Sequence, residues 1–297
     1  MLFERQRLLL TLLDAIDEPV GHTDFQKLLF LYTRECEATP SYEFVPYKFG
    51  AFSFTSYADK RKLISAGLLT DDEQQWSLTN SGRATAKEKA VEPLLTMRFY
   101  SRHKRLRGNS LIIEQYRRYP YYAARSEITD KLRLEPEALA RIAAARPRKQ
   151  PAGIVTIGYE GHSLESYLNE LLRDGVTLLC DVRRNPLSRK YGFSKGTLSN
   201  ACEGVGIRYK HLPELGIASE QRKKLHSQAD YDALFTRYEQ ENLPRQHAAL
   251  GMIQEWVENA ERVALTCFER RPEQCHRHCV AEALERIGGS KFGARHL

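Results

Sequence analysis

The sequence predicts an α/β protein in two parts: a mainly helical, winged-helix-like N-terminal domain, then a Rossmann-like open sheet that is mostly parallel. Amphipathic helix patterns fill the N-terminal half, and short apolar runs alternate with helix patterns after residue 150. A stretch that breaks all periodicity, RPRKQPAG, separates the two. We expect domains at 1–92 and 151–297, joined by a basic, tyrosine-rich helical connector at 93–150.

Composition is that of a globular chain, with 297 residues of which 42% are hydrophobic and 28% charged. No apolar run reaches the roughly 18 residues that a membrane span needs. The brief LLLTLL patch near the N-terminus has neither the flanks nor the cleavage site of a signal peptide. Six scattered cysteines indicate reduced thiols rather than a disulfide framework. We therefore expect a cytoplasmic protein with no membrane partner.

The positive charge is concentrated in the N-terminal half. Residues 1–150 carry 25 Lys and Arg against 19 Asp and Glu, a net +6 of the total +7. A basic excess favours a polyanionic partner. We expect a nucleic acid, DNA in preference to RNA, or a nucleotide. The sequence does not indicate an oligomeric state.

The N-terminal helices and strands are predicted from the spacing of apolar residues and from residues that break helices. Leucines at helical spacing predict helices at about 6–17 and 24–36, and a third helix is expected at 53–66, ended by Gly67. The following LLTDDEQQWSLTNSG indicates two short strands around a polar turn. A helix, a glycine stop and a ribbon form the pattern of a winged helix, in which the helix before the ribbon can enter the DNA major groove.

Two basic segments provide candidate nucleic-acid contacts. One is the helix expected at 53–66, and the other is 97–125, where cations alternate with tyrosines that could stack on unpaired bases. The candidates are Lys60, Arg61, Lys62, Arg102, Lys104, Arg105, Arg117 and Arg118. The alternatives are a solvated helix face, tyrosines that pack between domains, and a winged helix that docks a protein partner.

Two segments, FQKLLFLYTREC and YKFGAFSFTSYADKRKLISAGLL, lie within residues 8–85. They resemble the Panacea type of antitoxin-like domain. The resemblance implies a role in binding nucleic acid or a partner, and no chemistry. It adds the hypothesis of an antitoxin-like protein of phage defence.

The C-terminal half opens with a βαβ unit. IVTIGYEG is a short strand, SLESYLNELLRDG a helix capped by Ser163 and ended by Gly175, and VTLLCDVRRNP a second strand. Parallel strands and a right-handed crossover follow from this order. We expect further strands at IRYKHL and VALTCFE, with helices at 231–238 and 248–260 between them. The chain then enters a terminal helix whose first turn is expected to carry CHR, 275–277.

Polar side chains fall at the ends of the expected strands. They are Tyr159 and Glu160, then Asp181 and Arg183, then Glu214, and finally Cys267 and Glu269. Ligands of open α/β sheets bind beyond the carboxyl ends of the strands, so these residues should converge there. The sequence therefore predicts an active site at that edge.

The motifs GYEG, DVRRNPLSR, HLPELG, and CFE with CHR occur in this order. Across about residues 153–287 they resemble the domain-of-unknown-function family 488. The resemblance implies a compact Rossmann-like domain with these motifs around a shared pocket. It implies no particular reaction.

Two kinds of sulfur chemistry are open at this edge. A thiolate at Cys275 would be stabilised by His276 and Arg277, although the loop lacks the glycines of phosphatase and rhodanese anion loops. Zinc could be bound by Cys267, Cys275, His276 and Cys279, although no Cys-x-x-Cys element is present. We predict no metal and no cofactor.

The favoured hypothesis uses carboxylates for N-glycosidic or phosphoester hydrolysis of a nucleotide or nucleic acid. Catalytic candidates are Glu160, Asp181, Glu269, Cys275 and His276, and candidates for binding substrate or phosphate are Tyr159, Arg183, Ser188, Glu214 and Arg277. The alternative is a DNA-binding regulator whose C-terminal domain senses a nucleotide-like ligand. Each residue alone also has a structural explanation, such as an internal ion pair between Asp181 and Arg183.

Overall fold

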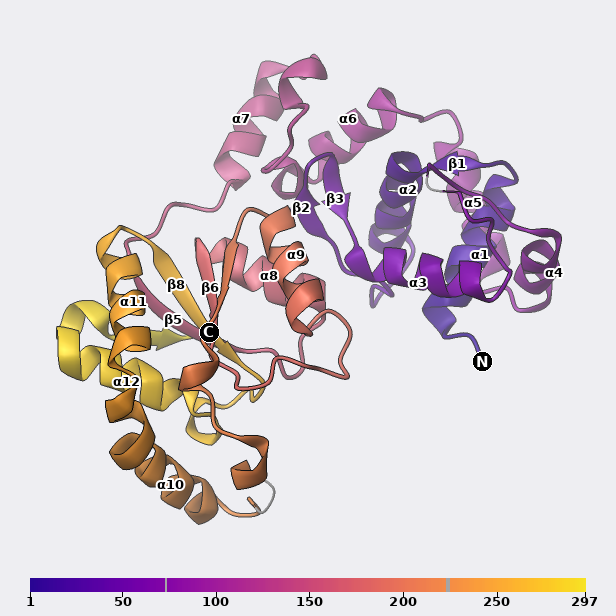
Figure 1. Cartoon of the computed structure of the whole chain (residues 1–297). Coiled ribbons are helices and arrows are strands. Elements are labelled where there is room, and N and C mark those ends of the chain that lie inside the picture. The colour runs from indigo at the N-terminus through magenta and orange to yellow at the C-terminus, as the bar shows by residue number, and fades with distance from the viewer. Residues whose placement is uncertain (73, 223–224) are drawn as a thin grey trace. The chain divides into compact units, whose positions relative to one another are not determined.

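The computed structural model describes residues 1–72, 74–222 and 225–297. They form two compact units, Met1–Arg146 and Pro147–Leu297, each with its own hydrophobic core (Figure 1). The first unit is mainly helical and the second contains a parallel sheet, which confirms the predicted fold class. Within these residues, no helix has both the length and the apolar composition that crossing a membrane requires.

The first unit begins with the helices α1 (Glu4–Ile16), α2 (His22–Glu35), α3 (Phe54–Ser65) and α4 (Asn80–Glu88). The leucines that predicted α1 and α2 are buried together in one cluster, as their helical spacing requires. The side chain of Ser53 caps α3, and that of Thr79 caps α4 by accepting from the amide of Gly82 at 2.9 Å.

Short strands connect these helices. β1 (Val20–Gly21) pairs with β4 (Gln75–Trp76), and β2 (Val45–Tyr47) pairs with β3 (Gly50–Phe52), both antiparallel. Leu69 and Leu78 form a further antiparallel bridge. Of the ribbon expected after Gly67, the structure has only this bridge, because the strand β4 pairs with β1 instead; Glu73 lies outside the described residues.

The basic, tyrosine-rich segment belongs to the same compact unit. It forms α5 (Pro93–His103), α6 (Asn109–Arg118) and α7 (Pro136–Ala145), with 3-10 turns at Pro120–Ala123 and Thr129–Lys131. Tyr116 and Tyr122 are buried, and Tyr100, Tyr119 and Tyr121 pack partly buried against the core of this unit. Much of the tyrosine surface is thus used for packing.

The carboxylate of Glu35 in α2 contacts several basic side chains of this segment. It accepts hydrogen bonds from Arg118 at 2.6 Å and His103 at 3.0 Å, and Arg102 lies 3.5 Å away. Burial opposes ionisation of Glu35, but the hydrogen bonds from His103 and Arg118 outweigh it and lower its pKa. The carboxylate therefore holds α2, α5 and α6 together.

We expect Glu35→Gln to lower the free energy of unfolding by about 1–2 kcal/mol at pH 7, because charge-assisted hydrogen bonds are lost. A carboxyl with a lowered folded pKa stabilises the protein above its unfolded pKa, and this contribution disappears as the pH falls through the folded value. Urea unfolding of wild type and variant should therefore converge only as the pH falls below the ordinary pKa of a glutamate and through the lowered folded value. Glu18→Gln, at an exposed ion pair, is the control; a pH-independent difference for Glu35→Gln would contradict the assignment.

The second unit contains a five-stranded, all-parallel sheet. Its strands are β5 (Gly153–Gly158), β6 (Leu178–Asp181), β7 (Arg208–His211), β8 (Arg262–Cys267) and β9 (Ala294–His296), in the order β7-β6-β8-β5-β9. Four of these strands were predicted. The edge strand β9 was missed because its three residues, Ala-Arg-His, have no apolar pattern; only pairing with β5 makes them a strand.

Helices cover both faces of this sheet (Figure 1). They are α8 (Leu164–Arg173) and α9 (Lys195–Gly204) on one side, and α11 (His247–Glu258) and α12 (Arg277–Gly288) on the other, with α10 (Gln228–Arg237) beyond the latter pair. The side chain of Ser163 caps α8, as predicted, and Gly175 ends the turn after it with a φ of 73°.

One local prediction is wrong: Cys275 does not lie in the first turn of the terminal helix. A 3-10 turn at Pro272–Gln274 is followed by extended backbone at Cys275 (φ −140°, ψ 126°), and α12 starts only at Arg277, with His276 at its N-cap. Proline fixes its own φ and initiates the 3-10 turn. The thiol is therefore held by a loop rather than by helical N–H groups.

Candidate functional site at the carboxyl edge of the sheet

The predicted residues converge at the carboxyl ends of β5, β6 and β8, but they divide into two groups. Asp181 is paired in register with Thr266, so Cys267, one residue further along β8, has the opposite orientation. Thr266 accepts from the hydroxyl of Tyr167 of α8, so Asp181 faces the side of α8 and α9, whereas Cys267 packs with core residues of α11 and α12.

The first group is a buried ion pair. The carboxylate of Asp181, with no exposed surface, accepts from Nε and Nη2 of Arg183 and, at 2.6 Å, from the hydroxyl of Tyr209. Arg183 Nη1 donates to the hydroxyl of Tyr159 at 3.0 Å and to the carbonyl of Phe193 at 2.8 Å. The rings of Tyr159 and Phe193 stack at 4.4 Å.

The charges of this group are balanced within the group. Burial alone would lower the pKa of Arg183, but the hydrogen bond and the charge of Asp181 outweigh it and raise that pKa. Burial, together with the charge of Asp181, raises the pKa of Tyr209, so its hydroxyl remains a donor. Asp181 and Arg183 thus satisfy each other and their neighbours, which leaves neither positioned to contact a substrate.

The second group consists of two thiols and an imidazole. Cys267, Cys275 and His276 are all buried, and Cys267 Sγ lies 3.8 Å from His276 Nδ1. His276 Nε2 lies 3.0 Å from the carbonyl oxygen of Val182. Because a carbonyl only accepts, Nε2 must be the protonated nitrogen, and the lone pair of Nδ1 is directed at the thiols. Cys279, one turn further along, instead contacts His278.

The two thiols differ in acidity. A hydrogen bond from Cys275 outweighs the effect of burial and, with the charge of Arg222, lowers the pKa of Cys267 to about 7. Burial raises the pKa of Cys275, which therefore acts as the donor. The more acidic thiol is thus Cys267, not the Cys275 that the sequence suggested.

Glu269 and Arg277 connect this group to its surroundings. Glu269 forms an ion pair with Arg222, and its other carboxylate oxygen lies 3.5 Å from Cys267 Sγ. Arg277 is fully buried and donates to the carbonyls of Glu269 and Arg270 and to Thr156 Oγ1. Its guanidinium therefore fixes the loop after β8, and its donors point at protein acceptors rather than at a phosphate site.

The glycine of GYEG makes this loop geometry possible. A Cβ atom on Gly158 would collide with the carbonyl group of Glu269, so the loop after β8 can pack against β5 only where β5 ends in glycine. The motif recognised in the sequence is thus explained in part by backbone packing.

The exposed surface of the same edge is basic and apolar. The loop RRNPLSRKYGFSK, 183–195, contains five cations and no acid. Leu187, Tyr191 and Phe268 are 74%, 39% and 42% exposed. Glu160 is also exposed, and its carboxylate accepts from the amide of Arg270 at 2.9 Å. The exposed cations are Arg184, Arg189 and Lys195 of this loop, with Arg270 and Arg271 after β8, whereas Arg183 is buried.

Two further candidates lie outside both buried groups. Ser188 Oγ accepts from the amide of Lys190 at 3.1 Å and so shapes the 183–195 loop. Glu214 is exposed in the 3-10 turn Pro213–Leu215 and is not among the hydrogen-bond partners of either group. Sequence reasoning missed Tyr209 and Phe193, which complete the ion-pair group, and Arg222, because none of them belongs to a polar motif at a strand end.

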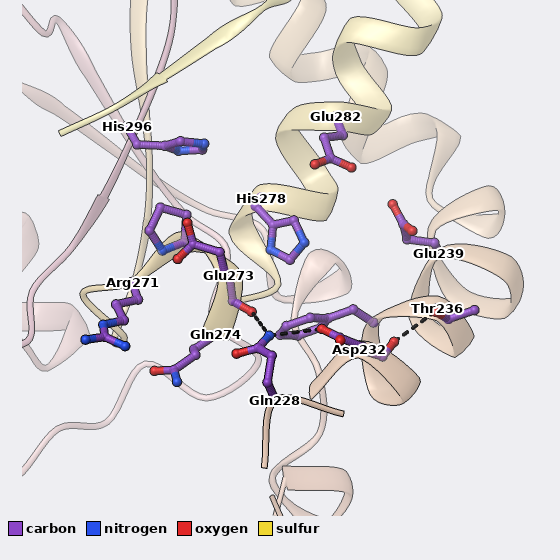
Figure 2. Close-up of a pocket in the computed structure, with 12 residues that line it drawn as sticks. Gln228, Asp232, Thr236, Glu239, Arg271, Glu273, Gln274, His278, Glu282 and His296 are labelled. Carbon is purple, nitrogen blue, oxygen red and sulfur yellow. Dashed lines mark hydrogen bonds between the residues drawn. The ribbon is translucent and has the colours of Figure 1, made fainter. Parts of the chain in front are cut away.

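A cavity of about 660 Å³ opens beside α10 and α12 (Figure 2). Its wall includes four carboxylates and two histidines: Asp232, Glu239, Glu273, Glu282, His278 and His296. Gln228 Nε2 donates to Asp232, one turn along α10, and to the carbonyl of Glu273 in the loop before α12. No predicted site residue lines it, and an acidic wall disfavours phosphate. We therefore place the candidate site at the sheet edge.

The nucleic-acid candidates of the first unit differ in availability. Lys60 is buried, and its ammonium donates to the carbonyls of Asp72 and Gln75 at 2.8 and 2.7 Å. Arg102 and Arg118 pair with Glu35, and Arg117 pairs with Glu135. The remaining four, Arg61, Lys62, Lys104 and Arg105, are exposed.

Comparison with known proteins identifies the second unit. Residues 163–284 match the family model described as domain of unknown function DUF488. No curated protein and no solved structure matches the chain. The family expected for the C-terminal domain is thereby confirmed, and the chemistry must be inferred from the site itself.

Proposed function

We propose that this chain, whose second unit carries a DUF488 domain, is a nucleic-acid-associated hydrolase. Its substrate would be a nucleotide or nucleic acid bound at the carboxyl edge of the sheet, and N-glycosidic cleavage is the favoured reaction. The observation that carries this proposal is the exposed basic and aromatic edge around Glu160.

Binding would combine charge and stacking. The 183–195 loop brings cations without any acid to the edge, and cations of this kind neutralise phosphates. Phe268 and Tyr191 expose ring surface beside them, and aromatic faces stack on bases irrespective of sequence. The exposed cations of the first unit, Arg61 and Lys62 among them, would themselves bind a polyanion or would dock a protein partner.

Catalysis would use Glu160 as the general acid or base. Asp181 and Glu269 are buried and already paired with arginines, whereas Glu160 is exposed and is oriented by a single backbone amide. A carboxylate that protonates a leaving group or activates water typically contributes 10²–10⁴-fold. The two buried carboxylates would support the edge rather than react.

The test is product formation from DNA, RNA and a nucleoside panel, followed by mass spectrometry. Glu160→Gln should reduce the rate by at least about 10²-fold. Glu258→Gln is the matched control, since Glu258 is exposed at the end of α11 that leads to the amino end of β8. Asp181→Asn is unsuitable, because it disturbs a buried ion pair.

Binding separates this proposal from its main alternative. Arg189→Ala and Arg270→Ala should each weaken binding and reduce the slope of log affinity against log salt by about 1. Arg61→Ala with Lys62→Ala tests the first unit in the same way. Ligand binding at the edge without any product would indicate a sensor domain, and unchanged turnover in Glu160→Gln would exclude the carboxylate mechanism.

A further inference from the structure

We propose that Cys267, Cys275 and His276 bind a zinc ion. The Sγ atoms of the two cysteines and a ring nitrogen of the histidine all lie within 4.8 Å of one another. Tetrahedral zinc with bonds of about 2.0–2.3 Å requires ligand atoms roughly 3.3–3.8 Å apart. The 3.8 Å between Cys267 Sγ and His276 Nδ1 already has this spacing. Among the residues described, no second group of three such ligands occurs.

The imidazole is prepared for this role by its other nitrogen. His276 Nε2–H donates to the carbonyl of Val182 at the end of β6, which leaves the Nδ1 lone pair directed at the sulfurs. Metal-binding histidines almost always donate their second N–H to a carboxylate or a backbone carbonyl, because this fixes both tautomer and ring orientation. A histidine that only filled space in the core would not require this orientation towards two thiols.

The site is held by three separate constraints. Cys267 ends β8, the 3-10 turn Pro272–Gln274 sets the extended backbone of Cys275, and the N-cap position of α12 carries His276. Arg277 then ties the intervening loop to β5, because it donates both to the loop carbonyls of Glu269 and Arg270 and to Thr156 Oγ1 of β5. The ligands are therefore preorganised, so binding requires little rearrangement.

Charge and ligand number favour zinc as the occupant. Two thiolates and one Zn²⁺ are neutral together, which suits three fully buried side chains, and Glu269 is already neutralised by Arg222. The carboxylate of Glu269 is not part of the three-ligand group, so one tetrahedral position is left for water. Three protein ligands and one water form the arrangement of catalytic rather than structural zinc sites. The proposal does not depend on the hydrolase function.

The alternative to a bound zinc ion is a disulfide between Cys267 and Cys275, since both are reduced thiols that lie close together. It would not use the imidazole. Cys279 provides a matched control, because it is a buried thiol on the same segment whose sulfur lies outside the group.

The experiment uses the full chain, reconstituted with Zn²⁺ or Co²⁺ after metal removal under reducing conditions. We expect one zinc per chain by elemental analysis, a thiolate-to-cobalt charge-transfer band, a higher unfolding temperature with zinc, and slower alkylation of Cys267 and Cys275. Cys275→Ser and His276→Gln should weaken zinc binding by more than about 100-fold, because loss even of a supporting hydrogen bond costs 10- to 100-fold. Cys279→Ser should retain one zinc.

Results on the wild-type chain alone can overturn the proposal, whether or not the variants fold. Reduced, reconstituted protein with no bound zinc and no cobalt band would exclude the site. A Cys267–Cys275 disulfide in protein isolated with chelator, with no metal uptake after reduction, would assign the pair to redox chemistry instead. Because metal content is the measurement, loss of the hydrolase activity would leave this test unaffected.

Discussion

Arg183→Met should lower the free energy of unfolding of the second unit by about 3–5 kcal/mol. The substitution leaves the fully buried carboxylate of Asp181 with only the hydroxyl of Tyr209 and the amide of residue 183 as donors. It also removes the donor to the hydroxyl of Tyr159. An uncompensated buried charge is the costliest outcome of breaking such a pair.

Hydrogen exchange of peptides from β5 and β6 in increasing urea measures this loss, because it follows the second unit separately from the first. The double variant Asp181→Leu with Arg183→Met is the matched comparison, since it removes both charges together. It should be less destabilised than Arg183→Met alone. A loss below about 1 kcal/mol for Arg183→Met would show that the pair is not a buried structural element, and would return Arg183 to the list of substrate contacts.

Arg277→Met should cost about 3–4 kcal/mol and loosen the loop between β8 and α12. The substitution leaves the carbonyls of Glu269 and Arg270 and the hydroxyl of Thr156 without their donor, and each unsatisfied buried acceptor costs about 1–3 kcal/mol. Arg277→Lys should not restore stability, because an ammonium lacks the planar set of donors that reaches several acceptors at once.

Urea unfolding measures the free energy of unfolding, and the alkylation rates of Cys267 and Cys275 measure how often the loop opens. Both rates should rise in Arg277→Met, since the guanidinium holds the backbone beside the two thiols. Arg271→Met is the control, because Arg271 is exposed on the same loop and should change stability by less than about 0.5 kcal/mol. Equal losses for the two variants would refute the clamping role of Arg277.

Local patterns accounted for most of the secondary structure. The βαβ unit, the cap at Ser163 and the stop at Gly175 follow from short-range rules, since apolar periodicity and side-chain caps act within a few residues. The strand β9 was not predicted, because only its pairing with β5 makes it a strand. The start of α12 was not predicted, because a proline-initiated turn sets it. The family of the second unit was also identified from its motifs.

These sequence patterns did not predict which individual side chains are buried and which are exposed for binding. The triplet Lys60, Arg61 and Lys62 looks uniform in sequence, yet the ammonium of Lys60 is buried between two carbonyls while its two neighbours are exposed. Helical rotation of 100° per residue separates them. Availability for phosphate therefore depends on which helix face packs against the ribbon.

The sequence by itself determined that polar residues end the strands of a parallel sheet, and hence that they meet at one edge. Only the tertiary structure decided how they are divided there. Pairing of Asp181 with Thr266, rather than with Cys267, directs the carboxylate to one face and the thiol to the other, because side chains alternate along a strand. A shift of one residue would have brought Asp181 beside Cys267 and His276. The actual register instead buries the ion pair on the side of α8 and α9, and brings two thiols and an imidazole together on the side of α12.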